Sequence, residues 1–186
     1  IIASRLFIIR FRGQKGDKNM TDKIKVGLIF GGNSSEYEVS IMSAHNIYEE
    51  IDTNKFDVYP MWITNDGYLA DDADSRRVLD NPKMEVANPH KVANISNIVE
   101  LKDRPEIDVF FPIVHGNLGE DGCLQGLFRV LDKPFVGDDV LAAAVTMDKE
   151  MTKILAQRAG VPVAKWIAVK RFEYNDPDNE KLDYEY

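Results

Sequence analysis

An apolar run followed at once by two glycines constrains this chain more than any other feature. Residues 26–30 are VGLIF, and the next ten residues are GGNSSEYEVS. A short apolar run that ends at glycine predicts a buried strand, and the glycines allow a tight turn that can approach a ligand closely. The carboxylates that follow are typical of the first turn of a helix. The sequence therefore predicts a strand, a sharp turn and a helix, an arrangement that can bind a small charged ligand.

A second pattern predicts how this helix begins. Ser35 and Glu38 have the S-x-x-E spacing of a capping box, in which each side chain bonds a free backbone N–H at the helix start. Glu36 would then lie in the first turn, where the helix dipole favours a charged carboxylate. A carboxylate held in this way is a suitable partner for an ammonium group.

Predicted strands and helices alternate after Lys23. The apolar patterns predict strands over 25–30, 56–64, 107–115 and 134–136, and helices over 41–51 and 121–131. The sequence Asn65-Asp66-Gly67 predicts a hairpin turn, and Pro112 predicts an edge position or an irregularity in its strand. Residues 71–104 are polar, and we expect a surface insertion there with a short helix near 95–101. The alternation predicts an α/β fold with a mostly parallel sheet, in which ligands bind beyond the carboxyl ends of the strands.

The two ends of the chain differ from this pattern. A long helix is predicted over 141–159, closed by Gly160, and a strand over 161–169. A lone helix and strand cannot bury a core, so we expect a second domain that is incomplete. Residues 1–20 carry five Lys/Arg. Because Lys15-Gly16-Asp17 back-translates to a sequence like a bacterial ribosome-binding site, we expect Met20 to be the natural start and the residues before it to be a non-native leader.

Composition excludes several classes of function. The net charge of -8 argues against a general nucleic-acid or anionic-membrane surface. The single cysteine, Cys123, rules out an internal disulfide and a cysteine-rich zinc site, and we expect it to be a core residue. No apolar run reaches the roughly 20 residues that a membrane-spanning helix needs. These features predict a cytoplasmic protein with no nucleic-acid or membrane partner.

A second glycine-rich stretch, HGNLGEDG, covers residues 115–122 at the end of a predicted strand. Its amides could bind a carboxylate or phosphate, and His115 could donate to such a group or could simply cap the strand. Glu120 and Asp121 are expected at a helix start. Lys149 and Lys153 share a helix face, which is either a solvated surface or a site that neutralises a nucleotide's phosphates. The chain has no P-loop or dinucleotide fingerprint, and its histidines lack metal-ligand spacing.

Four motifs together resemble those of the D-alanine–D-alanine ligases of the ATP-grasp superfamily. They are GGNSSEYEVS at 31–40, HGNLGEDGCLQG at 115–126, MDK at 147–149 and GVPVA at 160–164. After the non-native leader expected over 1–20, the resemblance implies a Rossmann-like pre-ATP-grasp domain with a parallel sheet flanked by helices over 21–139. It implies the truncated start of an ATP-grasp domain over 140–186. It also implies an enzyme that uses ATP and Mg²⁺ (or Mn²⁺) to join two D-alanines for peptidoglycan precursors, through an acyl phosphate.

The resemblance also implies roles for single residues. Glu36 and His115 are the expected catalytic residues: Glu36 would hold the ammonium of the first D-alanine, and His115 would lie near the substrate carboxylate and the tetrahedral intermediate. Lining residues of the substrate site would be Val39, Ser40 and Gly116. Lys149 would bind ATP.

The other nucleotide ligands and the metal ligands are expected after residue 186, so the fragment alone is predicted to be inactive and the full-length protein to be a homodimer. Two alternatives stay open. One is a ligase of the same family that joins D-alanine to D-lactate or D-serine. The other is a non-catalytic α/β module that binds a ligand between Glu36 and His115.

Overall fold

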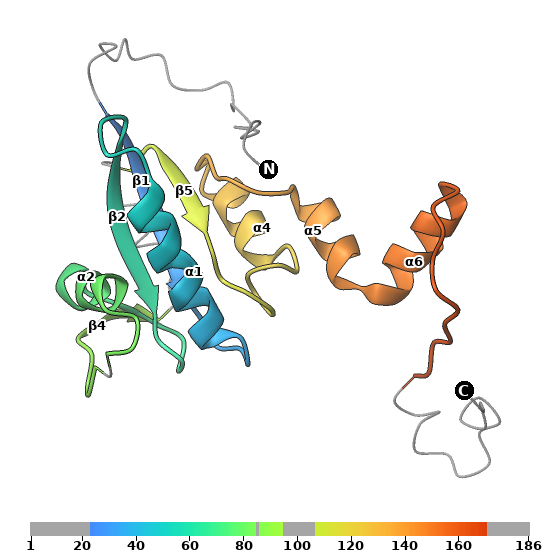
Figure 1. The fold of residues 1–186 in the computed structure, drawn as a ribbon, viewed down its shortest axis with the longest axis horizontal. Helices are drawn as coiled ribbons and strands as arrows, with labels where there is room; N and C mark the ends of the chain where they lie inside the picture. Colours follow the sequence, from blue (N-terminus) through green and yellow to red (C-terminus); the bar gives the residue numbers. More distant parts are fainter. Residues whose placement is uncertain (1–22, 85, 95–106, 171–186) are drawn as a thin grey trace. The chain divides into compact units, whose positions relative to one another are not determined.

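The computed structural model describes residues 23–84, 86–94 and 107–170, in two compact units that divide between Ala144 and Val145. The first unit is built on a five-stranded sheet (Figure 1). Its strands are β1 (Ile24–Gly31), β2 (Phe56–Ile63), β3 (Tyr68–Ala70), β4 (Lys91–Asn94) and β5 (Val109–Pro112).

The order of strands in the sheet is β4-β3-β2-β1-β5. β1 pairs in parallel with both β2 and β5, whereas β3 is antiparallel to β2 and to β4. The predicted α/β class and the hairpin at Asn65-Asp66-Gly67 are thus confirmed, and the hairpin makes the sheet mixed. Because β2 and β5 lie on opposite sides of β1, the strand order reverses at β1. Such a reversal is where open α/β sheets bind their ligands, at the carboxyl ends of the strands.

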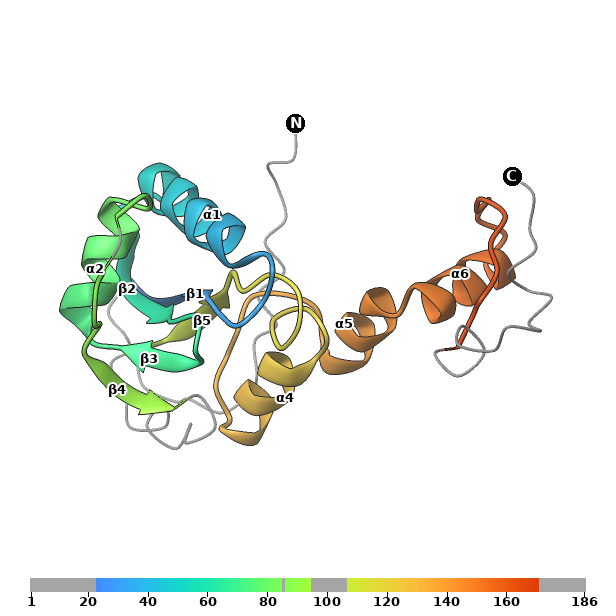
Figure 2. The same cartoon turned by 90° about the horizontal axis from the view of Figure 1, so that it is seen from below.

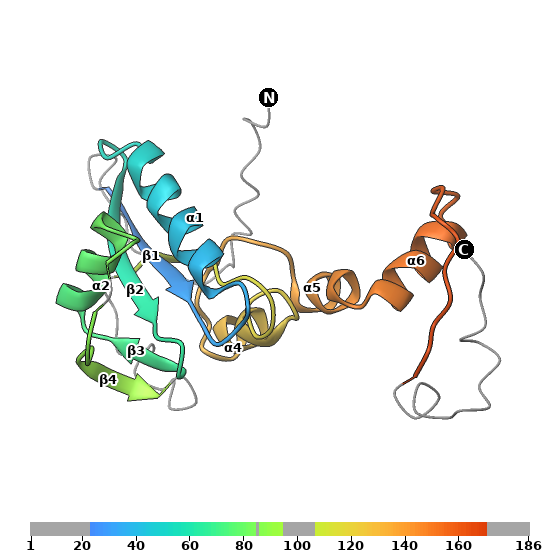
Figure 3. The same ribbon diagram turned by 60° about the horizontal axis from the view of Figure 1, so that its bottom comes forward.

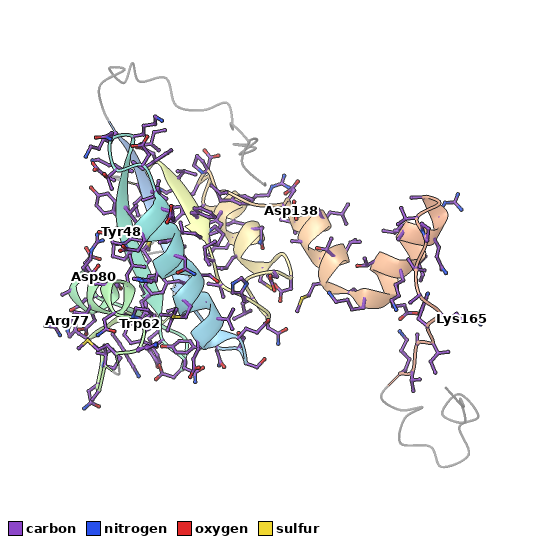
Figure 4. The ribbon with its side chains drawn as sticks, in the orientation of Figure 1. Tyr48, Trp62, Arg77, Asp80, Asp138 and Lys165 are labelled. Carbon is purple, nitrogen blue, oxygen red and sulfur yellow. The ribbon has the colours of Figure 1, made fainter. Side chains whose placement is uncertain are left out.

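Helices cover both faces of this sheet. α1 (Tyr37–Glu50) and α2 (Asp72–Asp80) lie on one face, and α4 (Cys123–Val130) lies on the other (Figure 2). Alternation along β1 explains the two layers, because Leu28 and Phe30 pack with Ile41 of α1 while Ile29 packs with Phe128 of α4. Tyr48 of α1 and Trp62 of β2, labelled in Figure 4, both lie in the apolar cluster on the α1 side of the sheet.

The polar segment after the hairpin is more regular than the sequence predicts. It contains α2 and β4, and β4 extends the sheet beyond β3 (Figure 3). The side chain of Asp71 caps α2 by accepting from the N–H of Asp74, and Val78 and Leu79 are buried against the sheet. Two adjacent apolar residues give no visible helical period, so the expected plain surface insertion is wrong here. The short helix expected near 95–101 lies outside the described residues.

The edge position expected for Pro112 agrees with the pairing of β5. The N–H of Ile113 donates to Ile29 of β1, whereas the N–H of Phe110 points away and donates to Pro134. Alternation places the nitrogen of Pro112 on the same outer side as that of Phe110, where a missing donor costs little. The strand predicted over 134–136 is reduced to a single bridge between Phe110 and Phe135.

The helix predicted over 141–159 is two helices. α5 (Val140–Met147) crosses the boundary between the units, and α6 (Lys149–Arg158) follows it. Asp148 separates them with an extended ψ of 105°, and its side chain caps α6 by accepting from the N–H of Met151. Gly160 follows α6 with a φ of 76°, as expected for a glycine that ends a helix.

The strand predicted over 161–169 does not form. A strand needs a neighbour to bond its backbone, and within the described residues this stretch pairs with none. The α6 helix likewise has no buried residue. The apolar side chains of Met151, Ile154 and Leu155 therefore remain exposed in the described unit.

Candidate active site

Two glycine-rich loops leave the carboxyl ends of neighbouring strands. The first glycine loop, residues 31–36, follows β1, and the second glycine loop, residues 115–122, follows β5. Because β1 and β5 are parallel and adjacent, the loops emerge side by side at the point where the strand order reverses. The sequence prediction of a ligand site at these strand ends therefore has a consistent structural framework.

Each loop contains a glycine that no other residue could replace without a clash. Gly31 has a φ of +88°, and a Cβ there would lie 2.1 Å from the carbonyl oxygen of Ile63. A Cβ at Gly119 would lie 1.8 Å from the carbonyl oxygen of Val114. Backbone atoms cannot move aside as the end of a side chain can. The glycines thus set the close packing of the loops on the sheet.

Ser34 links the two loops. Its hydroxyl donates to the carbonyl of His115 (2.9 Å) and accepts from the N–H of Glu36 (3.2 Å). The carboxylate of Glu36 lies against the second loop, since a Cβ at Gly116 would be 3.0 Å from Glu36 Oε2. The structure therefore brings Glu36, Gly116 and the backbone of His115 together, from segments some eighty residues apart in sequence.

The predicted capping box does not form. α1 begins at Tyr37, and Glu36 is its N-cap residue without a side-chain capping bond. The helix begins one residue later than a capping box with Ser35 as its N-cap requires. Ser34 bonds the turn instead, because its carbonyl accepts from the N–H of Tyr37 and its hydroxyl accepts from the N–H of Glu36. Glu36 nevertheless lies at the N-terminal end of α1, where the helix dipole favours a carboxylate.

The ring of His115 lies between a hydroxyl and a carboxylate. Its Nε2 is 3.2 Å from Ser43 Oγ on α1, and its Nδ1 is 3.6 Å from Glu120 Oε1. The other oxygen of Glu120 accepts from the N–H of Gly116 at 2.8 Å. The ring of His115 is thus hydrogen-bonded by Ser43 and faces the carboxylate of Glu120, which also holds the loop through Gly116. An imidazole held in this way can interact with a charged group of a ligand nearby.

Ser40 and Val39 differ sharply in their surroundings. Ser40 is fully buried, and its hydroxyl accepts from the N–H of Gly31 (2.8 Å) and donates to the carbonyl of Ile113. It anchors the start of each loop. Val39 is 55% exposed on α1. The substrate-lining roles expected for both residues stay predictions.

The sequence did not point to Ser34, Ser43 or the contact of Glu120 with His115. A signal for Ser43 was present, because Glu36, Ser40 and Ser43 follow one another at helical spacing and share one face. All three meet the segment around His115 in the folded chain. Ser34 had no such periodic signal, since it lies before the helix.

Asp121 organises the end of the second loop. It accepts from the N–H groups of Leu118 (2.9 Å) and Cys123 (3.0 Å). Partial burial raises the pKa of Asp121, but these backbone donors outweigh burial and hold the pKa below its usual value. Cys123 is exposed, so its expected place in the core is wrong: the buried side of α4 carries Leu124 and Phe128.

Lys149 belongs to the second unit, which is described separately. It opens α6, and its Nζ donates to the carbonyl of Thr146 at 3.3 Å. An ammonium has three donors, so this contact leaves capacity for a phosphate. Among the described residues there is no group of three His, Cys, Asp or Glu that could hold a metal ion. That part of the chain also has no helix long and apolar enough to cross a membrane.

A protein-family comparison decides the kinship of this chain. The family model described as the N-terminus of D-Ala–D-Ala ligase matches residues 25–138, which include both glycine loops. The chain belongs to the D-alanine–D-alanine ligase family. The match supports the resemblance drawn from the motifs of the two loops.

Individual relatives agree with this assignment. A D-alanine–D-alanine ligase of Lactobacillus johnsonii is 99% identical over 167 residues, which cover 90% of this chain and 46% of that protein. The structure of the VanG D-Ala:D-Ser ligase from Enterococcus faecalis is 32% identical (TM-score 0.59; 82% of this chain and 47% of that one). A Bacillus anthracis D-alanine–D-alanine ligase complexed with ATP is 28% identical (TM-score 0.57; 87% and 45%). The chain spans less than half the length of these proteins.

Proposed function

We propose that the full-length protein joins two D-alanines in an ATP-dependent reaction that supplies peptidoglycan precursors. The observation that carries the proposal is the meeting of Glu36, Gly116 and His115 where the strand order reverses. Family membership and the near-identical Lactobacillus johnsonii ligase support the same activity. The carboxylate of the first D-alanine is phosphorylated by ATP, and the amine of the second displaces phosphate from the acyl phosphate.

Glu36 is suited to bind the ammonium group of the first D-alanine. Its carboxylate is exposed at the N-terminal end of α1 and lies beside Gly116, where the missing Cβ leaves room for it. Glu120 adds a second carboxylate nearby through its contact with His115. Two negative side chains at one loop pair attract a cationic amine rather than an anion.

His115 is suited to act on the carboxylate end of the same ligand. The backbone around it is held by Ser34 and the ring by Ser43, so the imidazole is oriented before a ligand arrives. A preorganised imidazole beside a reacting carboxylate stabilises the negative charge that develops in the tetrahedral intermediate. Such stabilisation needs no movement of the loop during the reaction.

Fewer residues of this chain support the assignments of ATP and the metal. Lys149 is proposed to bind a phosphate of ATP, consistent with its spare donor capacity and with the ATP complex of the Bacillus anthracis relative. No described cluster fits Mg²⁺ or Mn²⁺, and we assign no step to a metal. We further propose that 21–139 form the substrate domain and 140–186 the start of an ATP-grasp domain, in a cytoplasmic homodimer without nucleic-acid or membrane partners.

The test is a kinetic comparison of two charge-removing variants of the full-length protein. Glu36→Gln should lower kcat/KM for D-alanine about 100-fold, because a charged hydrogen bond to the ammonium is lost. Glu38→Gln is the matched control: it is exposed in the first turn of the same helix and should change kcat/KM less than twofold. Equal effects of both variants would refute the role of Glu36.

One observation favours a second candidate, ligation of D-alanine to D-serine. The VanG D-Ala:D-Ser ligase shares 32% identity with this part of the chain. Competing D-alanine, D-serine and D-lactate as acceptors at neutral pH separates the activities, and we expect D-alanine to be preferred. The 186-residue chain alone should release no phosphate. If the full-length protein also released none but bound D-alanine, the binding-module alternative would hold.

A further inference from the structure

Ser43 contacts His115 through side chains alone. Ser43 is half-buried on α1, and its Oγ is 3.2 Å from Nε2 of the His115 ring. On the far side of the ring, Nδ1 faces Glu120 Oε1 at 3.6 Å. Glu120 is itself held, because its second oxygen accepts from the N–H of Gly116. The ring therefore has a fixed neighbour at each nitrogen.

We propose that Ser43 is a positioning residue that fixes the orientation and the tautomer of His115. A neutral imidazole has one N–H donor and one nitrogen that accepts. A carboxylate only accepts, so Glu120 favours the proton on Nδ1. The Ser43 hydroxyl can then donate to the lone pair of Nε2. Because a hydroxyl can also accept, Ser43 does not select the tautomer by itself. It holds the ring with Nδ1 toward Glu120, and the carboxylate then selects the Nδ1–H form.

The consequence for catalysis rests on the proposed function. His115 is attached at two points. Its carbonyl accepts from Ser34 of the first glycine loop, and its ring is hydrogen-bonded to Ser43 on α1. Each attachment removes freedom that the imidazole would otherwise lose when the intermediate forms. Orientation gained in advance in this way lowers the barrier of the chemical step rather than the dissociation constant of the substrate.

The same chain contains an internal reference for the tautomer. His45 Nδ1 lies 2.8 Å from the carbonyl oxygen of Leu79, and a carbonyl only accepts, so this nitrogen carries the proton. His45 lies two residues after Ser43 on α1 but does not depend on its hydroxyl. The chain has three histidines, so their ring signals can be separated by NMR.

The first experiment records ring ¹⁵N–¹H correlation spectra of the 186-residue chain at about pH 8, where imidazole is ordinarily neutral. His115 should show the Nδ1–H pattern, as His45 does. In Ser43→Ala the His115 pattern should shift toward a mixture with Nε2–H, and Ser43→Thr should restore it, while His45 stays unchanged in both as the control for folding. An Nε2–H pattern in the wild type, or an unchanged pattern in Ser43→Ala, would overturn the proposal.

The second experiment measures kinetics of the full-length protein. Ser43→Ala should lower kcat about tenfold with KM for D-alanine changed less than twofold, and Ser43→Thr should recover most of kcat. If the tautomer shifts but kcat does not, the positioning role in catalysis is overturned. If the wild-type protein forms no D-alanyl-D-alanine, the proposed function fails, whereas the NMR result still decides what Ser43 does to His115.

Discussion

Side-chain hydroxyls accept from backbone N–H groups of the first glycine loop, whereas side-chain carboxylates accept from those of the second. In the first, Ser40 bonds the N–H of Gly31, and Ser34 bonds the N–H of Glu36. In the second, Glu120 bonds the N–H of Gly116, and Asp121 bonds two further backbone N–H groups. The two loops leave adjacent parallel strands, yet their backbones are supported by different chemistry.

The difference bears on what the site can bind and on how it responds to pH. A hydroxyl does not ionise in the ordinary range, so the first loop should keep its shape wherever the fold is stable. The carboxylates of the second loop support its backbone and also add negative charge beside Glu36. One loop thus sets geometry independently of pH, and the other combines geometry with an electrostatic field that favours an amine.

The largest predicted effect comes from adding a methyl group to a loop glycine. In Gly31→Ala and Gly119→Ala the new Cβ would meet a backbone carbonyl, at 2.1 Å and 1.8 Å respectively. Each variant should lose about 3 kcal/mol or more of unfolding free energy, measured by urea denaturation, because backbone and not only side chains must shift. If one loop tolerates the change, that loop is not fixed by the sheet beneath it.

Gly126 is the matched control for these variants. It lies inside α4, and a Cβ there would have no neighbour closer than 4.0 Å. Gly126→Ala should therefore stabilise the chain, by about 0.5–1 kcal/mol, through helix propensity. A loss of stability in all three variants would show that glycine replacement is harmful for reasons unrelated to the two loops.

The next effect in size tests the hydroxyl support of the first loop. Ser40→Ala leaves the N–H of Gly31 and the carbonyl of Ile113 without this partner in a buried position, which should cost about 2–4 kcal/mol in urea denaturation. Ser35→Ala is the control. Ser35 is exposed and makes no capping bond to α1, so its loss should stay within about 0.5 kcal/mol, whereas a capping box would cost about 1 kcal/mol.

The comparison of loops also shows which parts of the fold can be predicted from sequence. β1, β2 and the hairpin were predictable because residues 26–30 and 58–63 are continuous apolar runs, the first followed by glycine and the second closely followed by Asn-Asp-Gly. The break between α5 and α6 had a local signal, since Asp148 is a favoured N-cap residue, but helical periodicity on both sides obscured it. The sequence of α2 has little apolar periodicity, so it does not predict a helix. The helix is instead stabilised by packing Val78 and Leu79 against the sheet.

The candidate site was predictable only where its residues form local patterns in the sequence. Glycine turns and the acids beside them are local patterns, so Glu36, His115 and Gly116 could be proposed from the sequence. The bonds from Ser34 and Ser43 to the segment at His115 span 81 and 72 residues. Such contacts depend on strand order, which no local pattern contains. For Cys123, the usual burial of free cysteine was outweighed by the helix face that α4 turns to the core.

A smaller effect should distinguish the loops by their response to acid. The pKa of Asp121 in the folded chain is below its usual value: burial raises it, and the N–H groups of Cys123 and Leu118 outweigh burial. A lowered pKa means that the stabilisation is present above the unfolded pKa, near 4, and is lost as the pH falls through the folded pKa. Amide exchange at Leu118 and Cys123 should accelerate in that window before exchange at Gly31 does.

Asp121→Asn provides the same test without acid. At neutral pH it should accelerate exchange of the Leu118 and Cys123 amides and leave the Gly31 amide, bonded to Ser40, unchanged. Simultaneous acceleration at all three amides, in acid or in the variant, would mean that the two loops open as one unit. Hydroxyl and carboxylate support would then not make the two loops respond differently.

The smallest effect concerns the thiol next to the second loop. The pKa of Cys123 is raised, first by its hydrogen bond to Asp121 and then by burial and by the charge of that carboxylate. Because the thiolate is the reactive form, exposed Cys123 should react slowly with an alkylating reagent at about pH 8, and Asp121→Asn should raise the rate about twofold. In concentrated urea the two proteins should react equally, since the hydrogen bond exists only in the folded loop. A rate difference that persists in urea would assign the effect to local sequence and not to the loop.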